Sequence, residues 1–166
     1  MDSYREILVQ RKTSMSNQII KFLLIALTAI VFAAGLLFMP ILLVAAIALG
    51  VASYFVIPRL EVEYEYLYVN GELDIDTIYS KQKRKKTASY DMAELELLAP
   101  SNSHALDYYR NNSQMKLKDF SSGNPDAKSY ILVFNREKGQ EMVKAELDDV
   151  IIADIRRLAP RKVNLI

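Results

Sequence analysis

The chain of 166 residues has no cysteine and a single histidine, His104. Without cysteine it can form no disulfide, no thiolate zinc site and no cysteine nucleophile. One histidine excludes motifs that need two, such as the paired-histidine metal site H-E-x-x-H. Charge is also missing from one long stretch, since residues 22–57 contain no Asp, Glu, Lys or Arg. About 18 such residues suffice for a membrane span, so this stretch predicts a membrane segment.

The charge-free stretch is too long for one straight span. A helix over 22–57 would be about 54 Å long, against a hydrocarbon core of about 30 Å. Gly35 and Pro40 interrupt the stretch near its middle, and proline removes a backbone hydrogen-bond donor. The sequence therefore predicts a transmembrane helical hairpin over 19–57, with helices at 19–37 and 41–57. One long tilted or kinked helix is the alternative.

Small residues recur at helical spacing in both predicted helices. They are Ala26, Ala29 and Ala33 in the first helix, then Ala45, Ala48 and Ala52 in the second, with Ala46-x-x-x-Gly50 beside them. Such stripes let helix backbones approach closely in lipid, so we expect them to pack the two helices together. The alternative is a dimerisation face or a pore. Neither predicted span contains an ionisable residue, so no ion path is indicated.

Basic residues near the ends of the hairpin predict its orientation. Those before it are Arg5, Arg11, Lys12 and Lys21, and Arg59 follows it. The turn between the helices has none. The positive-inside rule then places both termini in the cytoplasm of a multi-pass protein of the plasma membrane. Residues 1–18 form a cytosolic N-terminal segment in this interpretation, and residues 60–166 form a cytosolic domain.

Residues 61–80 predict a β-hairpin. Asn70-Gly71 fits a type I′ turn, in which both central residues need a positive φ. A two-residue turn fixes the register, so that the numbers of paired residues add up to 141. The predicted pairs on one face are Tyr68–Leu73, Tyr66–Ile75, Tyr64–Thr77 and Val62–Tyr79. On the other face Glu65 opposes Asp76, an unfavourable pair that indicates a solvated face or a nearby cation.

Further strands and one helix follow. The strands are expected at 86–90, 94–99, 115–120, 130–135 and 141–147, with a hairpin turn at 136–140 and loops at 100–112 and 121–128. From Asp148 to Leu158 the segment has acids first and bases last, which predicts an amphipathic helix that Pro160 ends. The predicted fold class is α+β: the transmembrane hairpin, then an antiparallel β-barrel or sandwich of about seven strands with one C-terminal α-helix.

This order of elements resembles a pleckstrin-homology-like (PH-like) domain, in which a helix closes one end of a bent antiparallel sheet. The whole layout resembles small bacterial membrane proteins with a two-helix hairpin followed by a bacterial PH-like domain. The strings E-Y-E-Y at 63–66, N-G-E-L-D-I-D at 70–76 and K-x-K-R-K-K at 81–86 are similar to a family of unknown function from Gram-positive bacteria. The resemblance implies an architecture and an inner-membrane location, and it implies no catalytic residue.

The basic run at 81–86 is the strongest candidate for a binding surface. Its members are Lys81, Lys83, Arg84, Lys85 and Lys86. The register places Lys81 opposite Leu60, at the membrane end of the β-hairpin, so the run should lie beside anionic lipid head groups. Arg59, Arg11, Lys12 and Lys21 would join this lipid-surface contact. The alternative is a solvated turn whose lysines protect a sheet edge.

No other motif predicts chemistry. Residues 61–166 hold 16 basic and 18 acidic residues, which is not the basic face of a nucleic-acid-binding domain. The D-x-D at 74–76 lacks the spacing of a calcium loop, and His104 has no nucleophile framework beside it. We expect no enzyme activity, metal or cofactor.

The predicted function is a non-catalytic binding or scaffolding module at the membrane. Its expected partners are anionic lipid and a protein partner or a second copy of the chain, with no nucleic acid. The alternative is a small oligomeric membrane pore or a regulatory subunit of a membrane complex.

Overall fold

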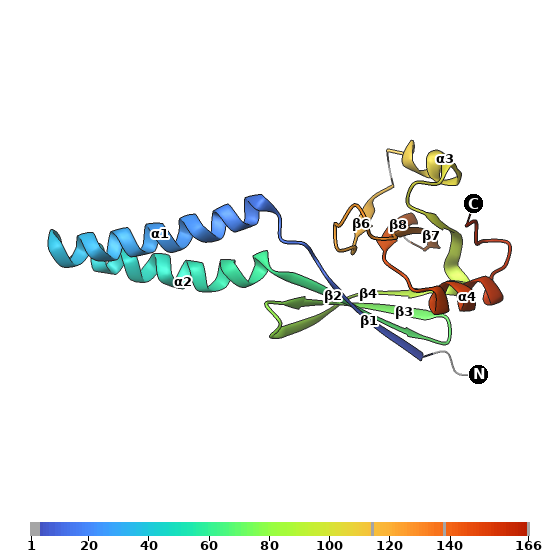
Figure 1. Cartoon of the computed structure of the whole chain (residues 1–166), viewed down its shortest axis with the longest axis horizontal. Helices are drawn as coiled ribbons and strands as arrows, with labels where there is room; N and C mark the ends of the chain where they lie inside the picture. Colours follow the sequence, from blue (N-terminus) through green and yellow to red (C-terminus); the bar gives the residue numbers. More distant parts are fainter. Residues whose placement is uncertain (1–3, 114, 138, 166) are drawn as a thin grey trace. The chain divides into compact units, whose positions relative to one another are not determined.

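The computed structural model of the chain describes residues 4–113, 115–137 and 139–165. It divides into two compact units, both drawn in Figure 1. The β unit comprises Met1–Arg11, Glu63–Thr77 and Arg84–Ile166, and the helical unit comprises Lys12–Val62 and Ile78–Lys83. Residues 1–3 of the predicted N-terminal segment, Lys138 of the predicted turn 136–140 and Ile166 of the predicted domain lie outside the described residues.

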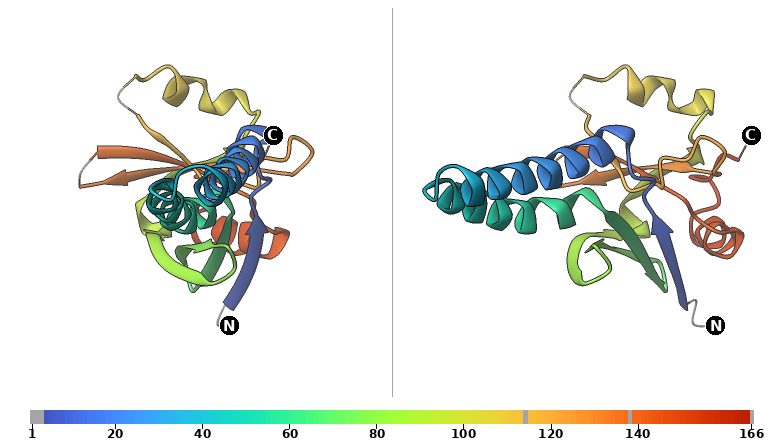
Figure 2. Two further views of the ribbon diagram at one scale, coloured as in Figure 1. Left: turned by 90° about the vertical axis from the view of Figure 1, so that its left-hand side faces the viewer. Right: turned by 60° about the vertical axis from the view of Figure 1, so that its left-hand side comes forward.

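The helical unit is the predicted hairpin. Helix α1 covers Met15–Leu37, helix α2 covers Leu42–Leu60, and Pro40 lies in the turn between them. Both helices are long and apolar enough to cross a membrane, with mean hydropathies of 2.5 and 1.9. The two helices lie side by side in all three views (Figures 1 and 2). The alternative of one long helix is therefore wrong.

Of the small residues that the stripes predicted, Ala46 is buried and most of the others are exposed. Gly35 of α1 is buried, and a Cβ added there would lie 2.8 Å from Cδ2 of Leu43. On α2 the buried residues are Ala46 and Ser53. The predicted contact stripes are wrong in most members, because Ala29, Ala33, Ala45, Ala48 and Ala52 are exposed. The spacing of small residues alone could not tell which side of each helix faces its partner.

The first sheet has the strand order β1-β2-β3-β4. Its strands are β1 Tyr4–Gln10, β2 Val62–Val69, β3 Glu72–Tyr79 and β4 Lys83–Asp91. The sequence predicts that residues 4–10 belong to a cytosolic segment separate from the domain, and here the structure differs. Strand β1 pairs antiparallel with β2, and Ile7 lies opposite Tyr66. Ile7 and Val9, two residues apart and therefore on one face, are half-buried and buried, which explains why this segment forms an edge strand with one covered face.

The predicted turn and face pattern of the β2–β3 hairpin are confirmed. Asn70 and Gly71 have φ angles of 48° and 91°, both positive as a type I′ turn requires. The buried residues of the two strands are Tyr64, Tyr66, Tyr68, Leu73, Ile75 and Thr77. At the far end the Ser80 backbone N–H donates to the Glu61 carbonyl at 2.9 Å, which is the predicted register.

The second sheet has the order β5-β7-β8-β6. Its strands are β5 Leu95–Pro100, β6 Leu117–Asp119, β7 Tyr130–Arg136 and β8 Gly139–Ala145. Strand β6 pairs with β8 in parallel, whereas an all-antiparallel arrangement was predicted. Of the predicted barrel or sandwich, the closed barrel is excluded, because the described residues form eight strands in two sheets that do not close into a barrel.

Short helices and one longer helix complete the β unit. The 3-10 turn η1 covers Met92–Glu94, directly before β5. A second 3-10 turn, η2 at His104–Leu106, leads into the short helix α3 at Asp107–Arg110, so part of the predicted loop 100–112 is helical. Helix α4 covers Asp149–Leu158, as predicted, with the Asp148 side chain accepting the Ile151 N–H at 2.9 Å as its N-cap.

Buried tyrosines connect α4 and both sheets. The Tyr68 hydroxyl donates to the Asp154 carboxylate of α4 at 2.9 Å, and the Tyr66 hydroxyl donates to the Phe120 carbonyl at 2.6 Å. The Tyr90 ring stacks on Phe134 of β7 with 4.7 Å between ring centroids. Each hydroxyl is satisfied, so these large side chains add apolar contact without an unpaired polar group.

Candidate functional site

Most of the basic run belongs to a strand rather than to a turn. Strand β4 was predicted to begin at Lys86, and it begins three residues earlier, at Lys83. Only Lys81 remains in the turn, where its φ of 59° is one of two adjacent positive values. Because side chains alternate between the faces of a strand, Arg84 and Lys86 share one face, and Lys83 and Lys85 share the other.

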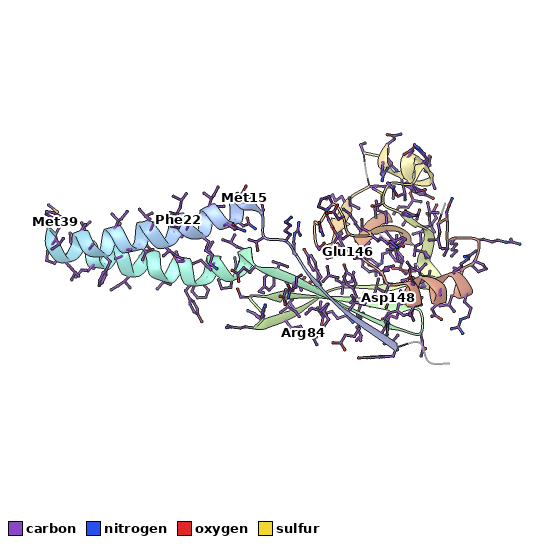
Figure 3. The ribbon with its side chains drawn as sticks, in the orientation of Figure 1. Met15, Phe22, Met39, Arg84, Glu146 and Asp148 are labelled. Atoms are coloured by element: carbon purple, nitrogen blue, oxygen red, sulfur yellow. The ribbon has the colours of Figure 1, made fainter. Side chains whose placement is uncertain are left out.

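Arg84 supplies the cation that the opposed acids of β2 and β3 predict. Its guanidinium forms ion pairs with Glu65 of β2 and with Asp76 of β3, the latter at 3.5 Å from Nε to Oδ2. Glu65 and Asp76 lie on the face opposite the buried tyrosines, and their side chains keep 12% and 22% exposure. A cation between two carboxylates converts a repulsive cross-strand pair into an attractive three-residue contact. Figure 3 labels Arg84 on its strand.

Lys86 forms the next step along the same face. Its ammonium lies 2.6 Å from Oδ2 of Asp74, and the Ser89 hydroxyl contacts Oδ1 of Asp74 at 2.5 Å and Glu72 at 3.0 Å. Partial burial raises the pKa of Asp74, but the hydrogen bonds from Lys86 and Ser89 outweigh burial and lower this pKa overall. The same hydrogen bond raises the pKa of Lys86. Both groups are therefore charged at neutral pH.

We call the residues Glu65, Asp74, Asp76, Arg84 and Lys86 the charge ladder. The acidic stretch of β2 and β3 and two residues of the basic run neutralise each other there. Among the described residues, no group of three His, Asp or Glu side chains is arranged to hold a metal ion. Ion pairs between neighbouring strands account for the position of each charge in the ladder.

Lys83 and Lys85 contrast with their neighbours on β4. Both are exposed, and no ion pair or side-chain hydrogen bond to another described residue holds either ammonium. Lys12 and Arg59 are likewise exposed, and no ion pair or side-chain hydrogen bond to another described residue holds either charge. Their charges remain available to a ligand.

The other predicted contact residues are engaged within the chain. Lys21 pairs with Glu61 at 2.6 Å inside the helical unit. The Arg11 guanidinium donates to the Tyr64 hydroxyl at 2.6 Å and lies 5.9 Å from the centroid of the Tyr64 ring. These contacts leave less of the positive charge of Lys21 and Arg11 for a lipid surface.

The turn before β4 is held at the end of α2. The Ser80 N–H donates to Glu61, its hydroxyl lies 3.4 Å from the Pro58 carbonyl, and Asn17 of α1 lies 3.4 Å from the Leu60 carbonyl. All of these residues belong to the helical unit. The structure therefore brings Lys81 and Lys83 to the same end of the helical hairpin as Lys12, Lys21 and Arg59.

The prediction for His104 is confirmed in its surface position. Its side chain is 99% exposed, and Nδ1 lies 3.1 Å from Oδ2 of Asp107 in the next turn. No described serine or cysteine nucleophile bonds to this ring. The contact joins the side chains of two exposed residues three positions apart in the sequence.

Sequence reasoning missed a charged cavity of about 640 Å³ in the β unit. Its charged lining residues are Glu94, Lys116, Lys118, Arg136, Glu137 and Glu141. Lys118 pairs with Glu141 at 2.5 Å and Arg136 with Glu94 at 3.2 Å, so most of this charge is internally balanced. Four of these residues come from η1, β6, β7 and β8, and Lys116 and Glu137 lie next to the ends of β6 and β7. No local motif in the sequence unites them.

The comparisons with known proteins identify the architecture. The model of the family Bacterial PH-like domain (DUF6106) matches residues 1–165. Neither the search of curated proteins nor the search of solved structures found a match. The chain therefore belongs to this bacterial PH-like family, as the resemblance implied, and the family model spans the helical hairpin as well as the two sheets.

Proposed function

We propose that the chain is a membrane-anchored, non-catalytic binding or scaffolding module, whose PH-like domain is held at the inner leaflet by the basic run. The pairing of β1 with β2 carries this proposal. Strand β1 precedes α1 and strand β2 follows α2, yet Tyr4–Gln10 and Glu63–Val69 are partners in one sheet. A bilayer cannot separate two hydrogen-bonded strands, so both ends of the helical hairpin would lie on one side of the membrane.

The surface of the helical hairpin supports a membrane location. Along α1 the side chains of Phe22, Ile30 and Leu37 are 71%, 65% and 76% exposed. Figure 3 labels Met15 and Phe22 on this helix and Met39 in the turn after it. An exposed apolar surface of such extent is unfavourable in water, and a hydrocarbon core of about 30 Å would cover it.

The basic residues support the cytoplasmic side and the leaflet contact. Lys12, Lys21, Arg59, Lys81 and Lys83 belong to the helical unit, at the end where α1 begins and α2 ends. The turn between the helices carries no base. This asymmetry is the one that the positive-inside rule associates with the cytoplasmic face, where anionic lipids attract basic side chains.

A cysteine-labelling experiment tests the topology. The chain has no native cysteine, so Met39→Cys and Gln82→Cys each create a single reactive thiol. A membrane-impermeant maleimide added to intact cells should label Met39→Cys and leave Gln82→Cys unlabelled, while inverted membrane vesicles should give the opposite result. Labelling of both sites from the same side would contradict the anchor.

A fluorophore on Gln82→Cys then tests the leaflet contact. In nanodiscs containing the full chain, head-group-labelled quencher lipid should quench this fluorophore more strongly with phosphatidylglycerol than with phosphatidylcholine alone. High salt should remove the difference, because it screens exposed charges. Equal quenching in both discs would show that the basic run makes no electrostatic contact with the leaflet.

The second candidate is an oligomeric pore or a regulatory subunit of a membrane complex. The exposed stripe Ala45, Ala48 and Ala52 on α2 favours it, because small residues allow helices of neighbouring copies to approach closely. The charge-free spans favour an anchor instead. Crosslinking in native membranes distinguishes the two: a discrete ring of four or more copies would support the pore.

A further inference from the structure

We propose that the basic residues on the two faces of β4 have different roles. Lys83 and Lys85 contact anionic phospholipid head groups, and Arg84 and Lys86 only hold the sheet together. This inference rests on the proposed leaflet contact and assigns it to two residues. It also removes Arg84 and Lys86 from the lipid-contact set that the sequence predicts.

A lipid would have to compete with carboxylates of the sheet for the cations of the charge ladder. Arg84 contacts Glu65 and Asp76, and Lys86 lies 2.6 Å from Asp74. These carboxylates belong to neighbouring strands, so their effective concentration beside the cations is high. A lipid phosphodiester would have to displace them and would leave their charges unpaired on the sheet. Lys83 and Lys85 involve no such exchange, since no described residue pairs with either ammonium.

The four basic residues lie on two different faces of strand β4. Arg84 and Lys86 share a face with the carboxylates of β2 and β3, which is the face opposite Tyr64, Tyr66 and Tyr68. Alternation along β4 places Lys83 and Lys85 on the other face. One strand thus presents two lysines that are free of the ladder, separated by a residue that the ladder holds.

The membrane-length helices favour a bilayer as the ligand of these lysines. Lys83 belongs to the same compact unit as α1 and α2, together with Lys12 and Arg59, which also lack a partner among the described residues. Continuity with two membrane-length helices favours a lipid surface over a diffusing acidic protein. Unpaired lysines near an anionic leaflet each contribute about 1 kcal/mol, or about fivefold in an equilibrium constant.

The chain offers a matched pair of variants for the test. Lys83→Gln/Lys85→Gln and Arg84→Gln/Lys86→Gln each remove two positive charges from the same strand. In nanodiscs with phosphatidylglycerol, using full-length protein labelled at Gln82→Cys, the first variant should lose the salt-sensitive part of the head-group quenching. Its contact equilibrium should fall by up to about 25-fold, the product of two fivefold effects. The second variant should keep its quenching within about twofold and should melt at a lower temperature.

Single variants keep the test valid if the ladder variant does not fold. Lys85→Gln and Lys86→Gln change adjacent lysines on opposite faces, and only the first should weaken quenching. An equal loss of quenching from Lys85→Gln and Lys86→Gln would mean that only the number of positive charges matters. It would overturn the proposal that the two faces of β4 have different roles.

The remaining outcomes separate this inference from the proposed function. A protein with the native basic run whose quenching ignores phosphatidylglycerol would overturn the leaflet contact itself. Contact that appears only in native membranes and disappears after their proteins are digested would assign Lys83 and Lys85 to an acidic protein partner and overturn the lipid assignment.

Discussion

The two sheets of the β unit are stabilised by different forces. In the second sheet, β7 has four consecutive buried residues, Ile131, Leu132, Val133 and Phe134, so both of its faces are covered. In the first sheet only the tyrosine face is buried, and the charge ladder occupies the other. Edge strand β4 begins with five exposed residues, 83–87. The central strand β7 of the second sheet is therefore held by apolar burial on both faces, whereas the first sheet combines apolar burial on one face with ion pairs on the other.

Truncation in the second sheet should have the largest effect. Phe134→Ala removes a fully buried ring that stacks on Tyr90, so we expect a loss of about 3–5 kcal/mol of unfolding free energy. Denaturation followed by circular dichroism in detergent measures it. Leu8→Ala on the outer face of β1, where Leu8 is 53% exposed, is the control and should change stability little. Similar losses from both variants would contradict the conclusion that the two sheets are stabilised differently.

Alkaline pH should act next, and through the first sheet. Burial foremost raises the pKa values of Tyr66, Tyr68 and Tyr90, and the carboxylates Asp154 and Glu141 raise the last two further. A folded-state pKa above the unfolded value near 10 means that their stabilisation is complete below about pH 10 and is lost as pH rises further. Tyrosinate absorbance should show these three ionising together with unfolding. Ionisation of all tyrosines near pH 10 in a folded protein would contradict their burial.

The turn of the first sheet should show a smaller effect. Gly71→Val places a β-branched residue at a φ of 91°, and its Cβ would lie 3.0 Å from Cδ1 of Leu158 on α4. We expect a loss of about 1 kcal/mol or more. Gly123→Val is the matched control: φ there is also positive, at 73°, but nothing lies within 4 Å of an added Cβ. It therefore has the strained backbone angle without a steric contact of the kind that Gly71→Val makes with Leu158. An unchanged melting temperature for Gly71→Val would exclude the type I′ hairpin.

The smallest effect should come from the charge ladder at acid pH. Asp74 has a folded-state pKa below its ordinary value of about 3.9, so its stabilisation is present above that pH and is lost as pH falls through the folded-state pKa. Asp74→Asn should flatten the stability curve in this acid range, and Lys86→Gln should do the same. Both groups are partly solvated, so high salt should reduce the difference between the variants and the parent chain.

Local chemistry in the sequence predicted the hairpin at 61–80 and the helix at 149–158, because the Asn70-Gly71 turn and the Asp148 cap act on neighbouring residues. The pairing of β1 with β2 was not predicted, since the two strands are separated by the whole helical hairpin. The three-residue strand β6 also pairs with a strand distant in the sequence. Such pairings depend on tertiary packing, which no local pattern specifies.

The candidate site was predicted in part. Opposed Glu65 and Asp76 indicated a nearby cation, and Arg84 is that cation. The sequence could not separate Arg84 and Lys86 from Lys83 and Lys85, because the predicted strand began at Lys86 and left the preceding residues in a turn. Only the ion pairs of β4 with β2 and β3 show which charges are paired.

The central claim is that the chain before α1 and the chain after α2 form one sheet. Glu6 lies opposite Leu67 in the β1–β2 register, so a Glu6→Cys/Leu67→Cys pair should form a disulfide when isolated native membranes are oxidised. Gln10→Cys/Leu67→Cys is four residues out of register, about 13 Å at 3.3 Å per residue, and should not. A disulfide in the first pair alone would place both ends of the hairpin on one side of the membrane. Failure of the first pair in folded protein, or equal crosslinking of both pairs, would contradict the account.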